Sequence, residues 1–128
     1  MSSEHQEQVA LFEWAGYARG ALPELDLLYA VPNGGLRHKA VAAKMKAEGA
    51  RAGVPDICLP VPRGGYHSLY IEMKYGKNKP TEKQAAWLKA LTDYGHYCKV
   101  CYGFEEAKGT IELYLEMAPT PTQLDIPF

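Results

Sequence analysis

Apolar and polar residues alternate along two neighbouring stretches, residues 54–59 and 69–74, and this period of two is typical of half-buried β-strands. Side chains two positions apart on a strand share a face. In the first stretch Val54, Asp56 and Cys58 therefore project to the same side. Asp56 is then a charged residue among apolar neighbours.

The second stretch separates its apolar and charged residues cleanly. Its apolar face is formed by alternate residues, Leu69, Ile71 and Met73. Glu72 and Lys74 share the opposite face with Tyr70. Residues 63–67, Arg-Gly-Gly-Tyr-His, have the composition of a turn, so the two stretches predict an antiparallel hairpin. Such a hairpin brings Asp56 within a few ångströms of Glu72.

Two helices and a strand are predicted before the hairpin. Ser2 or Ser3 is expected to cap the first helix, which runs to about residue 19. Residues 27–31 form a nearly continuous apolar run, which predicts a strand buried on both faces. The second helix spans residues 36–48. Its buried stripe is expected to consist of Val41, Ala42 and Met45.

Two helices and a strand are also predicted after the hairpin. Thr81 and Gln84 fit a capping box at the start of a helix over residues 81–94. The packing face of that helix is expected to consist of Ala85, Trp87, Leu88 and Leu91. Residues 97–102 form the next strand, and residues 104–117 the last helix.

The order of these elements predicts an α/β protein in which helices lie on both sides of a central mixed sheet. A length of 128 residues corresponds to a single domain. We expect this domain to span residues 1–117, followed by an irregular, proline-containing tail over residues 118–128.

Composition excludes some classes of protein. Apolar residues make up 47% and charged residues 23% of the chain, which is typical of a soluble globular protein. No run approaches the roughly 18 apolar residues of a membrane span, so we expect a cytoplasmic protein without a membrane partner. Cys98 and Cys101 are three positions apart on a strand predicted to be buried, where they face opposite sides. This argues against a zinc or redox site, and with Cys58 they are expected to be reduced thiols.

The net charge of −1 does not by itself indicate a nucleic-acid partner, but the basic residues are clustered. One cluster precedes the hairpin and comprises Arg37, His38, Lys39, Lys44, Lys46 and Arg51. The other follows it and comprises Lys74, Lys77, Lys79 and Lys83. Such patches can bind phosphates, although charged helix faces are often simply solvated.

The grouping of Asp56, Glu72 and Lys74 suits a hard divalent cation. Mg²⁺ takes oxygen ligands, usually one or two carboxylates with waters and substrate phosphate. A bound metal ion can generate a nucleophile from water and neutralise developing charge. The alternative is structural: Glu72 and Lys74 form a solvated pair on an edge strand, and Asp56 merely opens a strand after Pro55.

Two further positions have equally open interpretations. Glu4 lies in the first turn of the first helix and can face the sheet, but an acid there also interacts favourably with the helix dipole. Asn33, followed by Gly34 and Gly35, can hold a phosphate or a single-stranded backbone, or can simply form a turn.

Four ordered segments resemble the stand-alone VRR-NUC domains of phages and bacteria, which are members of the PD-(D/E)XK nuclease superfamily. They are residues 31–39 (VPNGGLRHK), 49–56 (GARAGVPD), 71–74 (IEMK) and 81–84 (TEKQ) followed by Trp87 and Leu88. The resemblance covers about residues 4–117. It implies the restriction-endonuclease-like fold, in which helices flank a central mixed four-stranded sheet.

The resemblance also implies roles for individual residues. Asp56 and Glu72 would bind Mg²⁺ or Mn²⁺, the carbonyl of Met73 would be a further ligand, and Lys74 would orient or activate water. The first helix of the family supplies a glutamate followed four residues later by glutamine. Glu4 and Gln8 match this spacing, so Glu4 would join Asp56 and Glu72 in holding one or two metal ions, with Glu7 as the fallback for Glu4. Gln84 matches the glutamine of the helix after the motif.

Stand-alone members are similar to Holliday-junction resolvases, so the resemblance implies a homodimer that cuts branched DNA. The leading hypothesis is therefore a metal-dependent DNA endonuclease. The residues expected to position its DNA are Asn33, Arg37, His38, Lys39, Lys77 and Lys79. One alternative is a non-catalytic DNA-binding or assembly module with the same fold. Another is a small hydrolase or transferase, for which the chain lacks a defined nucleophile or cofactor loop.

Overall fold

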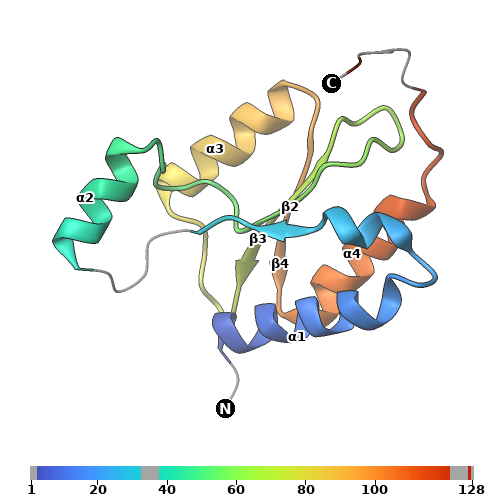
Figure 1. Cartoon of the computed structure of the whole chain (residues 1–128), viewed down its shortest axis with the longest axis horizontal. Helices are drawn as coiled ribbons and strands as arrows, with labels where there is room; N and C mark the ends of the chain where they lie inside the picture. The colour runs from blue at the N-terminus through green and yellow to red at the C-terminus, as the bar shows by residue number, and fades with distance from the viewer. Residues whose placement is uncertain (1–2, 33–37, 122–126, 128) are drawn as a thin grey trace.

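The computed structural model describes residues 3–32, 38–121 and 127. Within these residues a four-stranded sheet is flanked by helices (Figure 1). The elements in chain order are α1 (Glu4–Ala18), the 3₁₀ helix η1 (Pro23–Leu27), β1 (Tyr29–Ala30), α2 (Lys39–Ala47), β2 (Ile57–Leu59), β3 (Leu69–Lys74), α3 (Glu82–Asp93), β4 (Tyr97–Tyr102) and α4 (Phe104–Glu116). No helix in the described part of the chain is both long and apolar enough to cross a bilayer.

The strands lie in the order β1-β2-β3-β4. β1 and β2 are antiparallel, as are β2 and β3, whereas β3 and β4 are parallel. The predicted α/β fold with a mixed four-stranded sheet is therefore confirmed. The predicted hairpin is also present, with Ile57 opposite Ile71 and Leu59 opposite Leu69. Asp56, one position before β2, consequently lies at the level of Glu72.

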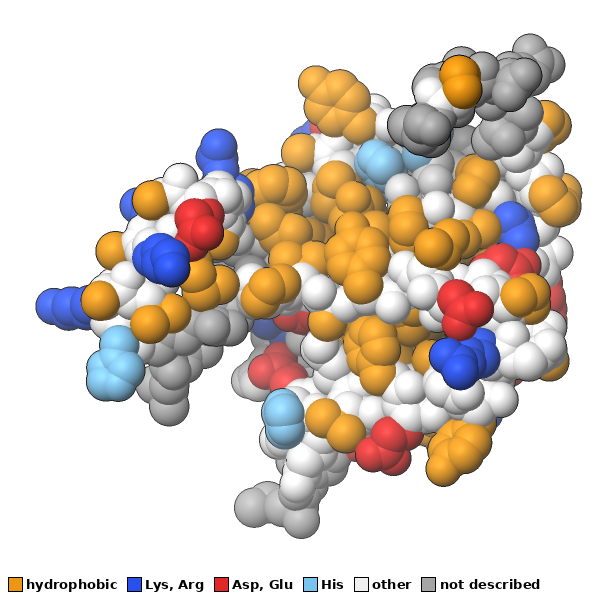
Figure 2. Space-filling view, viewed as in Figure 1, with side chains coloured by type: hydrophobic (Ala, Val, Ile, Leu, Met, Phe, Trp, Pro, Cys, Tyr) orange, Lys and Arg blue, Asp and Glu red, His pale blue; other side chains and the backbone are white. Residues whose placement is uncertain are grey.

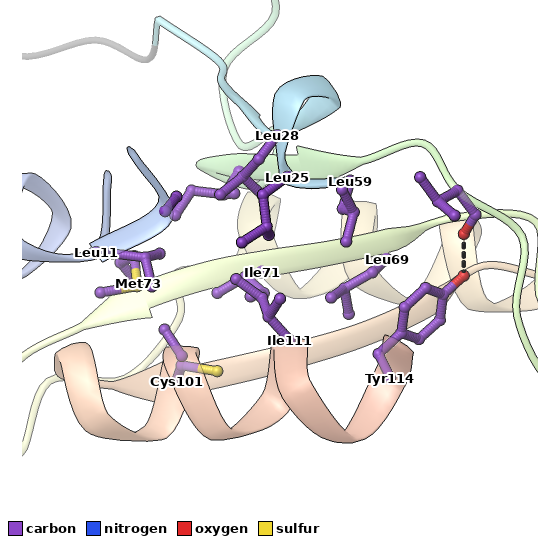
Figure 3. Packing of buried hydrophobic residues seen from close by; sticks show 14 residues of the cluster. Leu11, Leu25, Leu28, Leu59, Leu69, Ile71, Met73, Cys101, Ile111 and Tyr114 are labelled. Atoms are coloured by element: carbon purple, nitrogen blue, oxygen red, sulfur yellow. Dashed lines mark hydrogen bonds between the residues drawn. The ribbon is translucent and has the colours of Figure 1, made fainter. Parts of the chain in front are cut away.

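The hydrophobic core lies on one face of the sheet, between the sheet and the helices α1 and α4 (Figure 3). Leu11 of α1 and Ile111 of α4 pack there against the predicted apolar face of β3. At one end of this core the Tyr114 hydroxyl donates a hydrogen bond of 2.6 Å to the carbonyl of Val61. Burial of so many aliphatic side chains on one face is the main source of stability for the domain.

The opposite face is covered less completely, because α3 packs against the edge strand β4 and no residue of α3 is buried. Trp87, Leu88 and Leu91 are only half-buried, and Ala85 is exposed. The predicted packing face of this helix is therefore only partly correct.

The expectation of a doubly buried strand at residues 27–31 is wrong. Residue 27 ends η1, and Tyr29 and Ala30 form a two-residue edge strand with exposed side chains. The strand lies at the edge of the sheet and pairs only with β2. Leu25 and Leu28 reach the core instead.

The buried stripe expected on the second helix is also wrong. α2 contains no buried residue: Val41 and Ala42 are exposed and Met45 is half-buried. The helix projects from the body of the molecule (Figure 1), so its apolar side has little of the sheet to pack against. Helical periodicity correctly indicated the helix, but it did not indicate how much of its face would be covered.

The cysteines of β4 face opposite sides, as predicted. Cys101 lies in the core, with its sulfur 3.5 Å from the Thr110 hydroxyl, whereas Cys98 is half-buried on the other face. The strand itself is an edge strand and is not buried on both faces. The three cysteines are free thiols in the structure.

The described start of the tail is held against the turn of the hairpin. Gly64 N–H donates to the carbonyl of Ala118 at 2.8 Å, and Gly65 N–H donates to the Thr120 hydroxyl at 3.0 Å. Arg63 and Pro119 form an isolated β-bridge. Residues 118–120 thus lack a helix or strand but still make specific backbone contacts.

Candidate active site

A pocket of about 320 Å³ lies at the C-terminal end of β3. Its walls come from α1, the segment before β2, β3 and the first turn of α3. The residues that line it are Glu4, His5, Gln8, Ala52, Gly53, Asp56, Glu72, Met73, Lys74 and Gln84. The fold therefore brings together all the side chains that the sequence suggested for catalysis and metal binding.

Asp56 is fixed in the pocket by the backbone of the neighbouring strand. Its Oδ2 accepts a hydrogen bond of 2.7 Å from the Met73 N–H. This bond between a side chain and the backbone lies just beyond Ile57 and Ile71, the last residue pair of the β2–β3 ladder at this end. The carboxylate is thereby oriented toward Glu72 before any ligand binds.

Glu72 is a buried acid with an incomplete set of partners. It is only 1% exposed, and its Oε1 has no hydrogen-bond partner. Burial raises the pKa of Glu72 to about 8, an effect reinforced by the adjacent Asp56 and by Glu4 and opposed by Lys74. A carboxyl group in this position favours the neutral form unless more positive charge is supplied.

Lys74 lies between two acids from different elements. Its Nζ is 3.8 Å from Glu72 Oε2 and 3.9 Å from Glu4 Oε1. The side chain is largely buried, so its ammonium group is held in place along the pocket wall. A cation that faces a pocket of three acids is suited to orienting a water molecule or a phosphate oxygen.

The structure distinguishes between the two candidate glutamates of α1. Glu7 Oε1 accepts a hydrogen bond of 2.9 Å from the Phe104 N–H at the start of α4. Gly103, which precedes α4, has φ 92°, and a Cβ there would lie 2.9 Å from Glu7 Oε1. Glu7 thus caps α4, where a carboxylate also interacts favourably with the helix dipole. Glu4, one turn earlier in α1, faces the pocket instead.

Gln84 forms the predicted capping box. Its Oε1 accepts a hydrogen bond of 2.9 Å from the Thr81 N–H, and its own N–H donates to the Thr81 hydroxyl at 3.2 Å. The residue also lines the pocket. Its side-chain oxygen therefore has a defined structural role at the pocket wall.

The four predicted DNA-binding residues that the structure describes do not line the pocket. Lys77 and Lys79 are exposed in the loop that follows β3, three and five positions after Lys74. His38 and Lys39 are exposed at the start of α2. Asn33 and Arg37 lie outside the described residues.

The sequence reasoning missed His5 and Gly53 in the pocket wall. His5 follows Glu4 and lies three positions before Gln8, so the helical spacing of His5 and Gln8 would have indicated a shared face. Gly53 has φ 93°, and a Cβ there would lie 2.9 Å from the backbone carbonyl of Lys83. A glycine just before the segment that carries the Pro-Asp dipeptide was the available signal for this close approach.

The donor set of the pocket fits a hard cation. In the described part of the chain, no three His, Cys, Asp or Glu side chains are close enough together to hold a metal ion. The candidate metal ligands are therefore Asp56, Glu72 and the backbone carbonyl of Met73. The Met73 side chain is in the core and cannot contribute. Mg²⁺ characteristically uses one or two carboxylates and completes its shell with other oxygens. The unpartnered Glu72 oxygen is an appropriate ligand for it.

Comparison with known proteins agrees with this geometry. The model of the VRR-NUC domain family matches residues 3–105. A solved structure described as a VRR_NUC domain protein is similar over 93% of both chains, with a TM-score of 0.79 and 27% sequence identity. No curated protein matches the chain. The chain therefore belongs to the VRR-NUC family of nuclease domains.

Proposed function

We propose that this protein is an endonuclease that hydrolyses phosphodiester bonds in DNA and depends on Mg²⁺ or Mn²⁺. The observation that carries the proposal is the state of Glu72: a buried carboxyl group with an unpartnered oxygen and a pKa of about 8, beside Asp56 and Lys74. Burying such a group costs stability, and the single cation beside it, Lys74 at 3.8 Å, offsets this cost only in part. A role in binding a metal ion explains why this destabilising carboxyl group lies at the end of β3.

In this proposal Asp56, Glu72 and the carbonyl of Met73 hold the metal ion. When bound, the ion lowers the pKa of water and neutralises charge on the phosphate. Lys74 orients the attacking water and stabilises the negative charge that develops in the transition state. Glu4 holds the Lys74 ammonium from the other side, while Gln84 fixes the first turn of α3 as the pocket wall.

The reaction is a hydrolysis in which water supplies the incoming group. The oxygen of water forms a bond to phosphorus, and the phosphorus bond to the leaving oxygen of the DNA backbone breaks. The leaving oxygen takes up a proton, and the attacking water loses one. Lys74 and the carboxylates line the pocket in which these proton transfers would occur.

The proposed substrate is branched DNA, and the proposed active form is a homodimer that cuts two strands. Exposed Lys77, Lys79, His38 and Lys39 support contacts with the phosphate backbone, to which Asn33 and Arg37 are added from the sequence. Backbone contacts carry little sequence information, so selection by DNA shape is expected.

The test is cleavage of labelled linear, flap, splayed-arm and four-way-junction DNA in Mg²⁺, Mn²⁺ or EDTA. We expect junction cleavage that requires the metal and is lost in Glu72→Gln and Lys74→Ala proteins. Lys89→Ala is the matched control, since Lys89 is an exposed lysine of α3 that pairs with Asp93. Wild-type rates in the Lys74→Ala protein would contradict the proposal. DNA binding without any metal-dependent cleavage would favour a non-catalytic module.

A further inference from the structure

A second hollow, of about 800 Å³, lies between α2 and α3. Its apolar surface is provided by Met45 of α2 and by Ala86 and Trp87 of α3. Figure 2 shows the lobe formed by α2 set apart from the body of the molecule, with Lys and Arg side chains on it. Neither Met45 nor Trp87 is fully buried, so this α2–α3 groove presents partly exposed apolar surface to a ligand.

The α2–α3 groove adjoins the active-site pocket. Ala52 lines both hollows. The next residue, Gly53, is packed so tightly on the backbone of Lys83 that a Cβ there would lie 2.9 Å from it. The segment before β2 therefore joins the floor of the groove to the wall of the pocket. A chain lying in the groove would therefore lie next to the pocket that contains Asp56.

The two hollows carry opposite charges. The active-site pocket is lined by three acids, Glu4, Asp56 and Glu72, and by one lysine, Lys74. The described residues that line the groove include three cations, Lys46, Arg51 and Lys83, and no acid. All three cationic side chains are exposed, so they can reach a polyanion without first losing a buried partner.

Cations around an aromatic floor are a combination suited to a single nucleic-acid strand. Bases stack on aromatic side chains while the basic residues contact the phosphates. The volume of the groove is within the roughly 300–1,000 Å³ of ligand pockets, which is the scale of a few nucleotides. Trp87 provides the stacking surface, and Lys46, Arg51 and Lys83 provide the charge.

We propose that the α2–α3 groove binds a single-stranded segment of the DNA substrate, next to the bond that is cut. The inference rests on the proposed nuclease function and adds to it that a few nucleotides beside the cleaved bond are unpaired in the bound branched DNA, as in a flap, a splayed arm or an opened branch point. It also gives a reason for the absence of buried residues in α2 and α3, because the bound strand covers the side of each helix that faces the groove.

Binding is tested in EDTA, where hydrolysis is not expected, with a labelled blunt duplex and the same duplex carrying an oligothymidine tail. Trp87→Leu keeps an apolar side chain but removes the stacking surface, and we expect it to weaken tail-dependent binding about tenfold. Trp87→Phe should restore most of that affinity. Equal losses for blunt and tailed DNA, or no loss for either, would overturn the proposal.

A double variant tests the charges of the groove. Arg51→Gln with Lys83→Gln should reduce the slope of log affinity against log salt by about one per residue for tailed DNA. The matched control is Lys89→Gln with Lys99→Gln, which removes two exposed lysines outside the groove. If control and groove variants lose affinity equally, general electrostatics explains the binding and the groove has no special role.

Trp87 also supplies a direct signal. The chain has two tryptophans, Trp14 and Trp87, so a Trp14→Phe protein reports on Trp87 alone. We expect oligothymidine to quench its fluorescence.

If sedimentation instead shows that Trp87→Leu converts a dimer into a monomer without altering tail binding, a second copy of the chain occupies the groove and the proposal fails. Cleavage in Mg²⁺ is measured separately. Tail binding without cleavage would contradict only the proposed nuclease function. Cleavage without tail binding would contradict only the proposed role of the α2–α3 groove.

Discussion

The two faces of β3 are buried to a similar degree but have opposite effects on stability. Leu69, Ile71 and Met73 are at most 2% exposed and pack against α1 and α4. Glu72 and Lys74, on the other face, are 1% and 7% exposed. Removing an aliphatic side chain from water stabilises the fold, whereas removing a carboxylate from water opposes it. One strand therefore holds the core with its odd-numbered residues and forms the site with its even-numbered ones.

The contrast indicates where this small domain gains stability and where it loses it. Burial of the apolar face of β3 stabilises the fold and offsets the destabilisation caused by burying charged groups on its polar face. Substitutions on each face should consequently have effects of opposite sign.

The largest effect is expected on the apolar side. Ile111→Ala removes a side chain that is 0% exposed and should lower the free energy of unfolding by about 2–5 kcal/mol. Leu113→Ala is the matched control on the same helix, because Leu113 is 67% exposed and should change stability by less than about 0.5 kcal/mol. Urea denaturation measures both. Similar losses in the two proteins would mean that the core does not lie under α4.

An effect of opposite sign, whose size depends on pH, is expected on the polar side for Glu72→Gln without metal. Glu72 has a pKa of about 8 in the folded protein, against 4.5 for an ordinary glutamate carboxyl group. Well below pH 4.5 it is neutral in both states, so its ionisation does not affect stability. As the pH rises toward 8 the unfolded chain loses the proton first, so wild-type stability falls by up to roughly 1.4 kcal/mol per pH unit.

The glutamine side chain of the variant stays neutral at every pH. Glu72→Gln should therefore be more stable than wild type above pH 8 and equal to it near pH 4. Thermal melts across this range measure the difference. Adding Mg²⁺ at pH 8 should raise the melting temperature of the wild type more than that of the variant. Glu112→Gln, which alters an exposed acid of α4, is the control. Parallel pH profiles for wild type and Glu72→Gln would show that the Glu72 carboxylate is ionised and solvated.

The parts of the structure that the sequence predicted well depend on local patterns. The alternation along residues 69–74 correctly assigned the two faces of β3, and the capping box of Thr81 and Gln84 was recognised from its spacing. Side chains that alternate on a strand or pair within one helical turn interact mainly with near neighbours. Such contacts can be predicted before the rest of the fold is known.

The predictions that failed concerned burial, which depends on how many elements cover a residue. The apolar run at residues 27–31 became an edge strand, and the apolar stripe of α2 was left uncovered. Neither outcome is encoded in the run itself, because both depend on the number of neighbours supplied by distant segments. The α2–α3 groove was missed for the same reason: its walls are brought together only by the fold.

Glu4 and Glu7 show the same limit within a single helix. Both are first-turn acids of α1, and the rotation of the helix decides that one faces Lys74 while the other accepts a hydrogen bond from Phe104. The sequence left them as alternatives. The structure assigns them to the two regions compared above, Glu4 to the polar pocket and Glu7 to the contact between the core helices.

The smallest effect should separate these two glutamates. Glu7→Ala removes the carboxylate that caps α4 and should lower the free energy of unfolding by about 1 kcal/mol, with metal-dependent cleavage retained. Glu4→Ala removes only a 3.9 Å ion pair with Lys74 at a partly exposed position, so its stability should change less while cleavage falls. Denaturant unfolding and a cleavage assay on the same preparations test both. Loss of cleavage at unchanged stability in Glu7→Ala would assign Glu7 to the pocket, because a residue that only caps α4 would affect folding before chemistry.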